Sequence, residues 1–595
     1  MHKYLDKIRI CLGHPMMPAF AVLLALVLTL PILKNGFCLD DNYHRLVFKG
    51  DKRFVAAEAS PLNLFCFENG TPQDSRKRNN SWVISEKVKV YFFRPISSLS
   101  HWLDYMLWPN NPALMHGQSL LWLAALVLCT GLFYRLVTGA GWVAGAAAVF
   151  FSVDYIHGVV TGWLSNRNAL LAGVFCMLCL ICHNRWRLAG WRAGAYLGPL
   201  SFVLSLLSAE AGIATCAYLF AHALFLEQGS LRSRFTGLVP YGIILVVWRI
   251  FYTVMGFGAE NIFGFYIDPL KEPLAYLSAI ALRAPLYLMG QMGTLPITPT
   301  MYIIPSVLQK ASFVFIALLG IVAVPLLRRQ RTVRFWSTGL LLCLLPICAV
   351  NADERNLLFA GIGAAGLMAH LLACIQQTNG FPLVRVWRWA ALVLAGQFIL
   401  IHVVCSPALY MIKNSSFAFS QYAVDKAAGT LPVVPAGDTR KIIIVNNPLP
   451  MLFVISVNLT NALHHQAKPV YDLTGGSVPL VINRLDPQTL TIRAERGALF
   501  EFPKIMMPGT KNMMKPGDRI DLDSMSMQAL DLFDGQPSAA SFRFSVPLED
   551  ESLLWFCWDE TGYVRFTPPA VGETVTLKPA VWNFKKTRES YRKQS

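Results

Sequence analysis

Apolar stretches of about 18 residues or more recur between Pro18 and Ser406, and they constrain the fold more than any other feature of the chain. A helix of that length spans the hydrocarbon core of a bilayer. Of the 595 residues, 54% are hydrophobic and only 15% are charged, whereas a soluble chain carries about 25% charged residues. The sequence therefore predicts a polytopic α-helical membrane protein.

The apolar stretches predict about eleven transmembrane crossings, several of them short for a full span. They are residues 16–33, 113–134, 141–161, 169–183, 195–208, 212–226, 236–255, 306–326, 335–350, 356–375 and 389–406. The region 256–305 is ambiguous, because it could hold an external amphipathic helix lying on the membrane or an additional pair of crossings.

Basic residues indicate the orientation of the crossings. Lys and Arg favour cytoplasmic loops, and Lys3, Lys7 and Arg9 precede the first apolar stretch, so we expect a cytoplasmic N-terminus. Alternate loops repeat the signal, at Arg135, Arg185, Arg187, Arg192, Arg232, Arg234, Arg328, Arg329, Arg331, Arg334, Arg385 and Arg388. The same rule explains much of the net charge of +17, which is therefore not taken as a sign of nucleic-acid binding.

The residues after about 430 have a different pattern. Short runs such as "KIIIV", "LFVISV", "LTIRA", "FRFSV" and "YVRFT" are rich in branched and aromatic residues and are separated by turn sequences such as "KPGD" and "DGQP". We expect a membrane domain over 1–428, with an external loop over 34–112, and an extracytoplasmic β-sandwich-like or half-barrel domain over 429–595.

Ionisable residues gather at the predicted external ends of the crossings. Such residues are costly at membrane depth, and Asp154 and Glu210 lie within otherwise apolar stretches, which favours a shared polar site over loops that are simply polar. The set comprises Asp40, Asp41, Arg94, His101, His116, Asp154, His157, Arg167, Glu210, Asp353, Glu354 and Arg355.

Several stretches resemble one family, in the same order and at similar spacing. "CLDDNYHRLVF" resembles the Asp-Asp motif in the first external loop of GT-C superfamily glycosyltransferases, which use lipid-linked sugars. "YFFRPISSLSHWLDYMLWPNNPALMHGQSLLW", "VVTGWLSNRNALLAG", "LSLLSAEAG" and "NADERNLLFAGIG" resemble later segments of bacterial relatives of the tetratricopeptide-containing transmembrane O-mannosyltransferases. The matching positions are Arg94, Pro95, Leu103, Asp104, Asn111, Pro112, His116, Trp163, Arg167, Asn168, Glu210, Glu354 and Arg355.

The chain also departs from that family. "DYIHGV" keeps only His157 of a His-Pro-x-His-x-Glu stretch, Ala209 replaces a Lys, and Ser119 and Leu123 stand where an Asn and a second His are expected. No tetratricopeptide array follows. The resemblance spans roughly residues 16–375, and it leaves the sugar and the acceptor open.

The resemblance implies an inverting, mannosyltransferase-like hexosyltransferase in a bacterial inner membrane. Its donor would be a polyprenyl-phosphate sugar, and its acceptor a hydroxyl of a protein, lipid or glycan on the extracytoplasmic face. Asp41, followed by Asp40, is the candidate general base. Adjacent carboxylates resist joint ionisation, so we expect an Arg or a divalent cation, Mg²⁺ or Mn²⁺, near Asp40 and Asp41. Candidates for phosphate binding are Arg94, Arg167, Arg355, His116 and His157, and candidates for support are Glu210, Asp154 and Glu354.

Two other function classes stay open. One is a catalytically silent glycan-binding or scaffold protein, and the other is a transporter of lipid-linked sugars, although the chain shows no internal duplication. No Gly-rich phosphate loop opens a helix after a strand, which argues against a nucleotide-sugar donor.

Cysteine gives little guidance. Cys176, Cys179 and Cys182 share helical spacing, and packing is favoured over zinc because the sequence suggests no His or acidic ligands for them. Cys38 and Cys66 lie in one external loop and could pair in an oxidising compartment.

Overall fold

The chain divides into two compact units in the computed structural model. One, the helical unit, comprises residues 1–36, 93–257 and 265–417, and the other, the mixed unit, comprises 37–92, 258–264 and 418–595. Residues 37–92, expected as an external loop of the membrane domain, thus pack with the C-terminal residues. The structure describes residues 2–52, 54–70, 81–83, 88–260, 266–293, 306–376, 385–433, 438–448, 457–460, 462–463, 470–476, 478–500 and 514–594.

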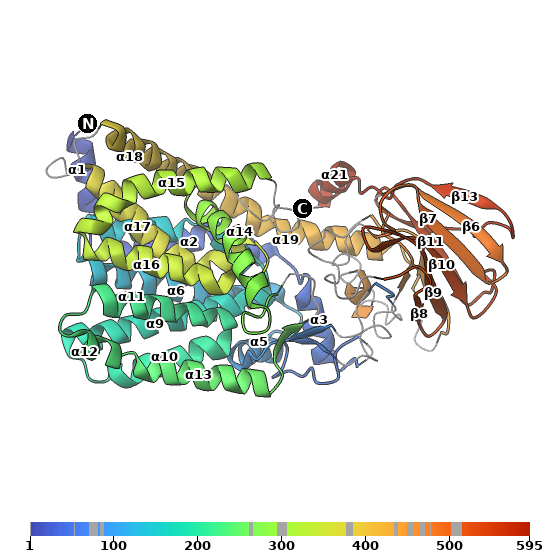
Figure 1. The fold of residues 1–595 in the computed structure, drawn as a ribbon, viewed down its shortest axis with the longest axis horizontal. Coiled ribbons are helices and arrows are strands. Elements are labelled where there is room, and N and C mark those ends of the chain that lie inside the picture. Colours follow the sequence, from blue (N-terminus) through green and yellow to red (C-terminus); the bar gives the residue numbers. More distant parts are fainter. Residues whose placement is uncertain are drawn as a thin grey trace. The chain divides into compact units, whose positions relative to one another are not determined.

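The helical unit is a bundle of helices that run side by side (Figure 1). Its main helices are α1 (His2–Gly13), α2 (Met17–Thr29), α5 (Pro95–Leu107), α6 (Pro112–Thr138), α7 (Trp142–Ser152), α8 (Ile156–Gly162), α9 (Arg167–Ala189), α10 (Gly194–Ser208), α11 (Thr215–Phe225), α12 (Leu231–Thr236), α13 (Val239–Val254), α14 (Pro273–Met292), α15 (Ser306–Arg329), α16 (Arg331–Ile347), α17 (Leu358–Gln376), α18 (Arg385–Phe398) and the first part of α19 (Ser406–Ala428). One short 3₁₀ turn, η1 (Leu30–Lys34), follows α2. Three others, η2 (Leu164–Asn166), η3 (Glu210–Ala214) and η5 (Glu354–Leu357), precede α9, α11 and α17.

Six helical stretches among the described residues are long and apolar enough to cross a membrane. They are Met17–Lys34, Pro112–Thr138, Leu164–Ala189, Ser306–Arg329, Glu354–Ile375 and Arg385–Ala428. The pair α7 and α8, bent by 50° at its break, makes a seventh if it counts as one span. By the length and composition of these helices, the chain is a multi-pass membrane protein.

Three predicted crossings form shorter apolar helices, Gly194–Ser208, Glu210–Phe225 and Val239–Val254, so the count of about eleven stays a prediction. In the ambiguous region 256–305, the described residues contain one helix, α14. It packs against α15, α16 and α17, and its second half from Pro285 to Met292 is buried.

Local sequence explains where a central helix begins and how closely the bundle packs. The side chain of Asn111 accepts a hydrogen bond from the Leu114 amide, and Pro112 occupies the first turn, as is typical of a helix start. In the core, Trp336 packs edge-on against Tyr134, and Gly366 lies against the same indole. A Cβ at Gly366 would lie 2.6 Å from the Trp336 ring, so the close approach requires glycine.

The mixed unit contains three sheets. A six-stranded antiparallel sheet has the order β13-β6-β7-β10-β9-β8, and a four-stranded sheet has the order β12-β11-β4-β5, with β4 parallel to both neighbours. A small sheet has the order β1-β2-β3. The bounds are β1 (Cys66–Asn69), β2 (Lys89–Tyr91), β3 (Gly258–Glu260), β4 (Lys441–Ile444), β5 (Tyr471–Asp472), β6 (Leu480–Asp486), β7 (Thr489–Ala494), β8 (Arg519–Asp521), β9 (Met525–Phe533), β10 (Gln536–Phe544), β11 (Leu553–Asp559), β12 (Gly562–Arg565) and β13 (Thr574–Leu577).

The predicted β-rich C-terminal region is confirmed. The runs "KIIIV", "LTIRA", "FRFSV" and "YVRFT" coincide with β4, β7, β10 and β12, whereas "LFVISV" lies mostly outside the described residues. The two larger sheets meet where Phe544 of β10 packs edge-on against Trp555 of β11, with ring centroids 5.1 Å apart.

Candidate functional site

The Asp pair opens a short helix in the mixed unit, α3 (Asp40–Lys49). Both carboxylates lie in its first turn, where the helix dipole favours negative charge. The helix ends at Gly50, whose φ of 71° lets its amide cap the carbonyls of Leu46 and Val47. Leu39, directly before the pair, has φ 49° and ψ −120°, a backbone conformation that strains a large side chain.

The two carboxylates differ in their surroundings. Asp41 is only 1% exposed, and its Oδ2 accepts a hydrogen bond of 3.1 Å from the Cys38 amide, whereas Asp40 is half-buried. Burial, together with the charges of Asp41 and Asp40, raises the pKa of the Cys38 thiol well above its ordinary value. The Cys38 thiol is therefore protonated at neutral pH and is a poor nucleophile or metal ligand. The groups that can act as a base at this place are the carboxylates of Asp40 and Asp41.

Buried aromatic contacts fix α3 in place. The Tyr43 hydroxyl donates to the carbonyl of Cys66 at 2.5 Å and accepts from the Ala56 amide at 3.1 Å. The His44 ring packs edge-on against Phe65. The Asp pair thus begins a packed helix. Cys38 and Cys66 are both free, so the suggested pairing is not formed.

In the helical unit, Arg94 and Glu210 form an ion pair. Arg94 occupies the position directly before α5, and its Nη2 lies 2.6 Å from Glu210 Oε2. The Tyr252 hydroxyl donates to Glu210 Oε1 at 3.0 Å. The Arg94 side chain is 16% exposed. Glu210 therefore orients an arginine that keeps some access to its surroundings.

Arg167, at the start of α9, is fully buried. Its Nη1 lies 2.5 Å from Asp104 Oδ2, and both side chains are 0% exposed. Its other guanidinium nitrogens donate to the hydroxyl of Ser119 at 2.9 Å and the carbonyl of Met115 at 2.6 Å. Nη1 also donates to Ser100 and Gln118.

This arrangement ties α5, α6 and α9 together through one cation. Burial raises the pKa of Asp104 to about 6, with the charge of Arg167 opposing the shift, so the carboxylate is ionised at neutral pH.

Arg355 lies in η5, before α17. Its Nε is 3.1 Å from Asp353 Oδ2, and its guanidinium lies 5.2 Å from the centre of the Trp163 ring, which stacks on Phe417. The Arg355 side chain is 26% exposed. The adjacent Glu354 is 0% exposed and forms an ion pair with Lys413 of α19.

The remaining predicted residues of the helical unit are buried in its interior. Asp154 lies at the break between α7 and α8, where Oδ1 accepts from the Ile156 amide at 3.1 Å and Oδ2 accepts from Gln291 at 2.8 Å. His157 Nε2 lies 2.6 Å from the Phe151 carbonyl oxygen. His116 is 0% exposed.

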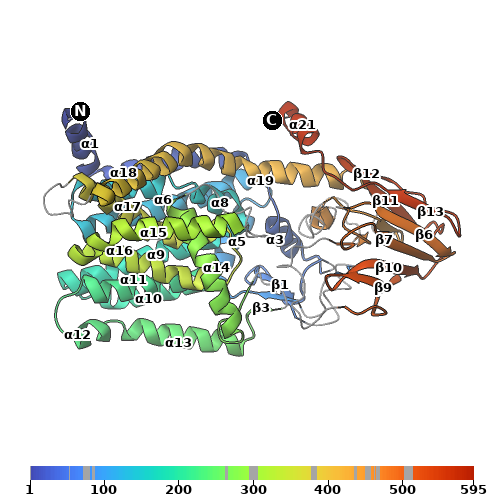
Figure 2. The same ribbon diagram turned by 45° about the horizontal axis from the view of Figure 1, so that its top comes forward.

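The structure thus gives every predicted site residue a place, in one unit or the other. α5, with Arg94 and Asp104, lies at the end of the helical unit opposite α12, as both Figure 1 and Figure 2 show. Figure 2 shows α8 at the same end as α5. The catalytic and phosphate-binding roles of these residues stay predictions.

Sequence reasoning assigned no role to Asp104 and Tyr252, the direct partners of Arg167 and Glu210. Asp104 lies in the stretch "HWLDYM". Its spacing of three and four residues from His101 and Ser100 places these polar side chains on one face of a helix, which is the signal in the sequence for a polar contact there. Nothing in the sequence marks Tyr252, which approaches Glu210 only because α13 lies next to α10.

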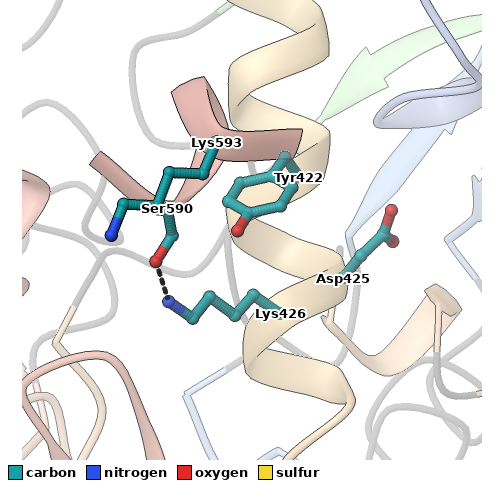
Figure 3. Close-up of a pocket in the computed structure, with 5 residues that line it drawn as sticks. All are labelled: Tyr422, Asp425, Lys426, Ser590 and Lys593. Carbon is teal, nitrogen blue, oxygen red and sulfur yellow. Dashed lines mark hydrogen bonds between the residues drawn. The ribbon is translucent and has the colours of Figure 1, made fainter. Parts of the chain in front are cut away.

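A cavity of about 530 Å³ lies between α19 and α21 (Phe584–Gln594) in the mixed unit. Figure 3 shows its lining, in which Lys426 donates to the Ser590 hydroxyl at 3.2 Å and Lys593 and Tyr422 lie nearby. The lining holds one carboxylate, Asp425, and none of the predicted site residues. We therefore do not place the site that the sequence predicts in this cavity.

Comparisons with known proteins find no matching family model and no matching curated sequence. Among solved structures, the chain is similar to the oligosaccharyltransferase of Archaeoglobus fulgidus, in its apo form and tethered to an acceptor peptide, with TM-scores of 0.41 and 0.40 at 12% identity. That match covers 75% of this chain and 63% of the oligosaccharyltransferase. ArnT from Cupriavidus metallidurans matches with a TM-score of 0.35 at 12% identity, covering 76% of this chain and 89% of ArnT.

An oligosaccharyltransferase is by name a glycosyltransferase, the class of enzyme that the sequence motifs resemble. A superposition this partial establishes neither a shared activity nor shared substrates. The activity, the substrates and the partners of this chain are therefore proposals, argued from its own residues.

Proposed function

We propose that this chain is a GT-C-like membrane glycosyltransferase that moves a sugar from a polyprenyl-phosphate donor to an acceptor hydroxyl. The proposal rests on one observation above all. Asp40 and Asp41 open a packed helix shortly after the first apolar helix, directly behind a strained Leu39. Strained backbone clusters at functional sites, where the surrounding structure stabilises it.

Asp41 is our assignment for the general base. Its hydrogen bond from the Cys38 amide fixes the carboxylate, and burial to 1% exposure shields it from bulk water. Both properties help a base that removes the proton from an attacking hydroxyl. The half-buried Asp40 is better placed to contact the acceptor or a cation.

A divalent cation, Mg²⁺ or Mn²⁺, suits the Asp pair because both ions prefer carboxylate oxygens. Asp40 and Asp41 would hold the ion through their carboxylates, which share the first turn of α3. When bound, such an ion would neutralise negative charge on the departing phosphate.

Arg94 and Arg355 are our candidates for contacts with the donor phosphate. Each is held by a carboxylate partner yet retains an exposed fraction of its side chain, 16% and 26%. A guanidinium kept in one orientation binds phosphate with little reorganisation. For Arg167, whose donors are engaged by protein acceptors, the contacts favour a bracing role over phosphate binding.

The finer features of the proposal come from the sequence resemblance. They are inversion at the anomeric carbon, a hexose such as mannose, a protein, lipid or glycan acceptor, and the extracytoplasmic face of a bacterial inner membrane. His116, His157, Asp154, Glu210 and Glu354 take supporting roles in it.

The test is release of polyprenyl phosphate by the full chain in lipid, given a panel of polyprenyl-phosphate sugars and a cell-envelope extract as acceptor. We expect turnover in the wild type and a loss of about 100-fold or more in Asp41→Asn, with Asp40→Asn also impaired. Glu58→Gln is the matched control, because Glu58 is an exposed acid in the same unit, and it should keep wild-type turnover.

Two outcomes would contradict the proposal. Equal turnover in the folded Asp variants and the wild type would remove the carboxylate base. Absence of release with every donor would instead favour a silent glycan-binding protein or a transporter, which transport of labelled donor across vesicles would distinguish.

A further inference from the structure

A second group of chemically active side chains lies at the other end of the helical unit. His183 lies near the end of α9, His222 near the end of α11, and Glu227 directly after α11. Their side chains are 0%, 1% and 2% exposed. This is the end that carries α12 (Figure 1) and the basic loops that we predict to be cytoplasmic.

The three side chains converge on one point. His183 Nε2 lies 3.3 Å and His222 Nδ1 lies 3.4 Å from the same atom, Glu227 Oε1, and the three atoms all lie within 4.8 Å of one another. Around tetrahedral zinc, with ligand bonds of about 2.0–2.2 Å, neighbouring ligand atoms lie roughly 3.3–3.6 Å apart. The two His–Glu distances already match that spacing.

The outer atoms of all three groups have partners suited to metal ligands. His183 Nδ1 lies 3.2 Å from the Tyr241 hydroxyl, and His222 Nε2 lies 3.1 Å from the side-chain amide of Asn184. The Tyr241 hydroxyl can accept the outer N–H of His183, which leaves Nε2 with a free lone pair. The Asn184 atom that faces His222 is its Nδ2, and turning this amide end for end presents its oxygen to the outer N–H of His222.

Glu227 is held from its other side. Arg187 Nε donates to Glu227 Oε2 at 2.7 Å, so Oε1 alone faces the two rings. Arg187 Nη2 also lies 2.7 Å from Oε2, and this ion pair favours the ionised carboxylate, the form that binds a metal.

The alternative is a buried hydrogen-bonded cluster without a metal, in which both rings donate to Glu227 Oε1. It fails at His222, whose Nδ1 has no hydrogen-bond partner in the described part of the chain although it lies close to the carboxylate. A buried nitrogen without a partner is unfavourable, and a bound cation would use its lone pair. The C-terminus of α11 adds partial negative charge beside His222, which lies in its last turn.

We propose that His183, His222 and Glu227 bind a divalent transition metal, with Zn²⁺ best matched by two imidazoles and one carboxylate. Water would complete the tetrahedron, and the ion would join the ends of α9 and α11. The proposal is independent of glycosyl transfer. It also revises the zinc argument made from the sequence, because His183 follows Cys182 directly, while Cys176 and Cys179 lie in the apolar core.

The test is the metal content of the full chain, purified through a tag without histidines, stripped with a chelator and reloaded with Zn²⁺. We expect about one ion per chain in the wild type and fewer than about 0.2 in His183→Ala and in His222→Ala. His370→Ala is the matched control, because His370 is buried in α17 away from the cluster, and it should keep the ion. Asp40→Asn combined with Asp41→Asn should also keep it, which separates this site from any cation at the Asp pair.

Two further measurements need no histidine variant that might misfold. Co²⁺ in place of Zn²⁺ should give the intense visible absorption of a tetrahedral site, and Zn²⁺ should raise the Tm of the wild type but not of Glu227→Gln. A stripped wild type that takes up no Zn²⁺, or histidine variants that bind it with wild-type stoichiometry, would overturn the proposal.

Discussion

Replacing Asp104 by Asn tests whether the buried ion pair with Arg167 holds α5 against α6 and α9. The substitution keeps the shape of the side chain but leaves the guanidinium, 0% exposed, without its counter-charge. Removing one partner of a buried pair destabilises a protein by about 3–5 kcal/mol. Because neutral acceptors on Ser119, Met115 and Gln118 still contact Arg167, we expect the lower end of this range, roughly 3 kcal/mol.

A loss of that size should lower the Tm of the detergent-solubilised chain by roughly 3–5 °C. A thiol-reactive fluorophore can follow unfolding, since eight of the free cysteines are buried, at positions 38, 66, 176, 179, 182, 343, 348 and 374. Asp521→Asn is the matched control, because its pair with Arg519 is mostly exposed, and it should leave the Tm unchanged.

The double substitution Asp104→Leu with Arg167→Met separates charge from packing. Replacing both charges by apolar side chains removes the unpaired cation, so we expect the free energy of unfolding to recover to within about 1 kcal/mol of the wild type. The ion pair does not hold the helices together if the Tm of the single variant falls by less than about 2 °C. The same conclusion follows if the double variant is no more stable than the single variant. The same double variant should keep release of polyprenyl phosphate if Arg167 is a brace and lose it if Arg167 binds the donor phosphate.

Two further predictions concern buried carboxylates. Burial raises the pKa of Asp472 from 3.8 to about 7, with a hydrogen bond from Asn447 opposing, so the folded state holds a proton that the unfolded state has lost. The free energy of unfolding should therefore fall as the pH rises from about 4 to about 7. Asp472→Asn should raise the Tm at about pH 8 more than at about pH 5. An equal effect of the substitution at both pH values would contradict the raised pKa. Lys413→Met removes an ion pair of the buried Glu354 and should destabilise the helical unit by about 2–4 kcal/mol in thermal unfolding. Lys586→Met, at an exposed pair, should leave the stability unchanged, and equal effects of the two substitutions would refute the reasoning.

Local patterns in the sequence were sufficient for the element types. The apolar stretches became long helices, and "KIIIV" and "YVRFT" became strands, because hydropathy and side-chain branching act over a few neighbouring residues. The Asp pair was recognised as a candidate site from its motif. That it begins a packed helix, with Asp41 buried and Leu39 strained, could not be read from a stretch that looks like a polar loop.

Only the tertiary structure decided which charged side chains meet. Arg167 was expected to face a phosphate, yet its partner Asp104 is 63 residues away in the chain, on a different helix. His183 and Glu227 are 44 residues apart, and no spacing rule connects them. Helix formation depends on near neighbours, whereas ion pairs and metal ligands depend on how helices pack, and many sequences with the same apolar periodicity could pack differently.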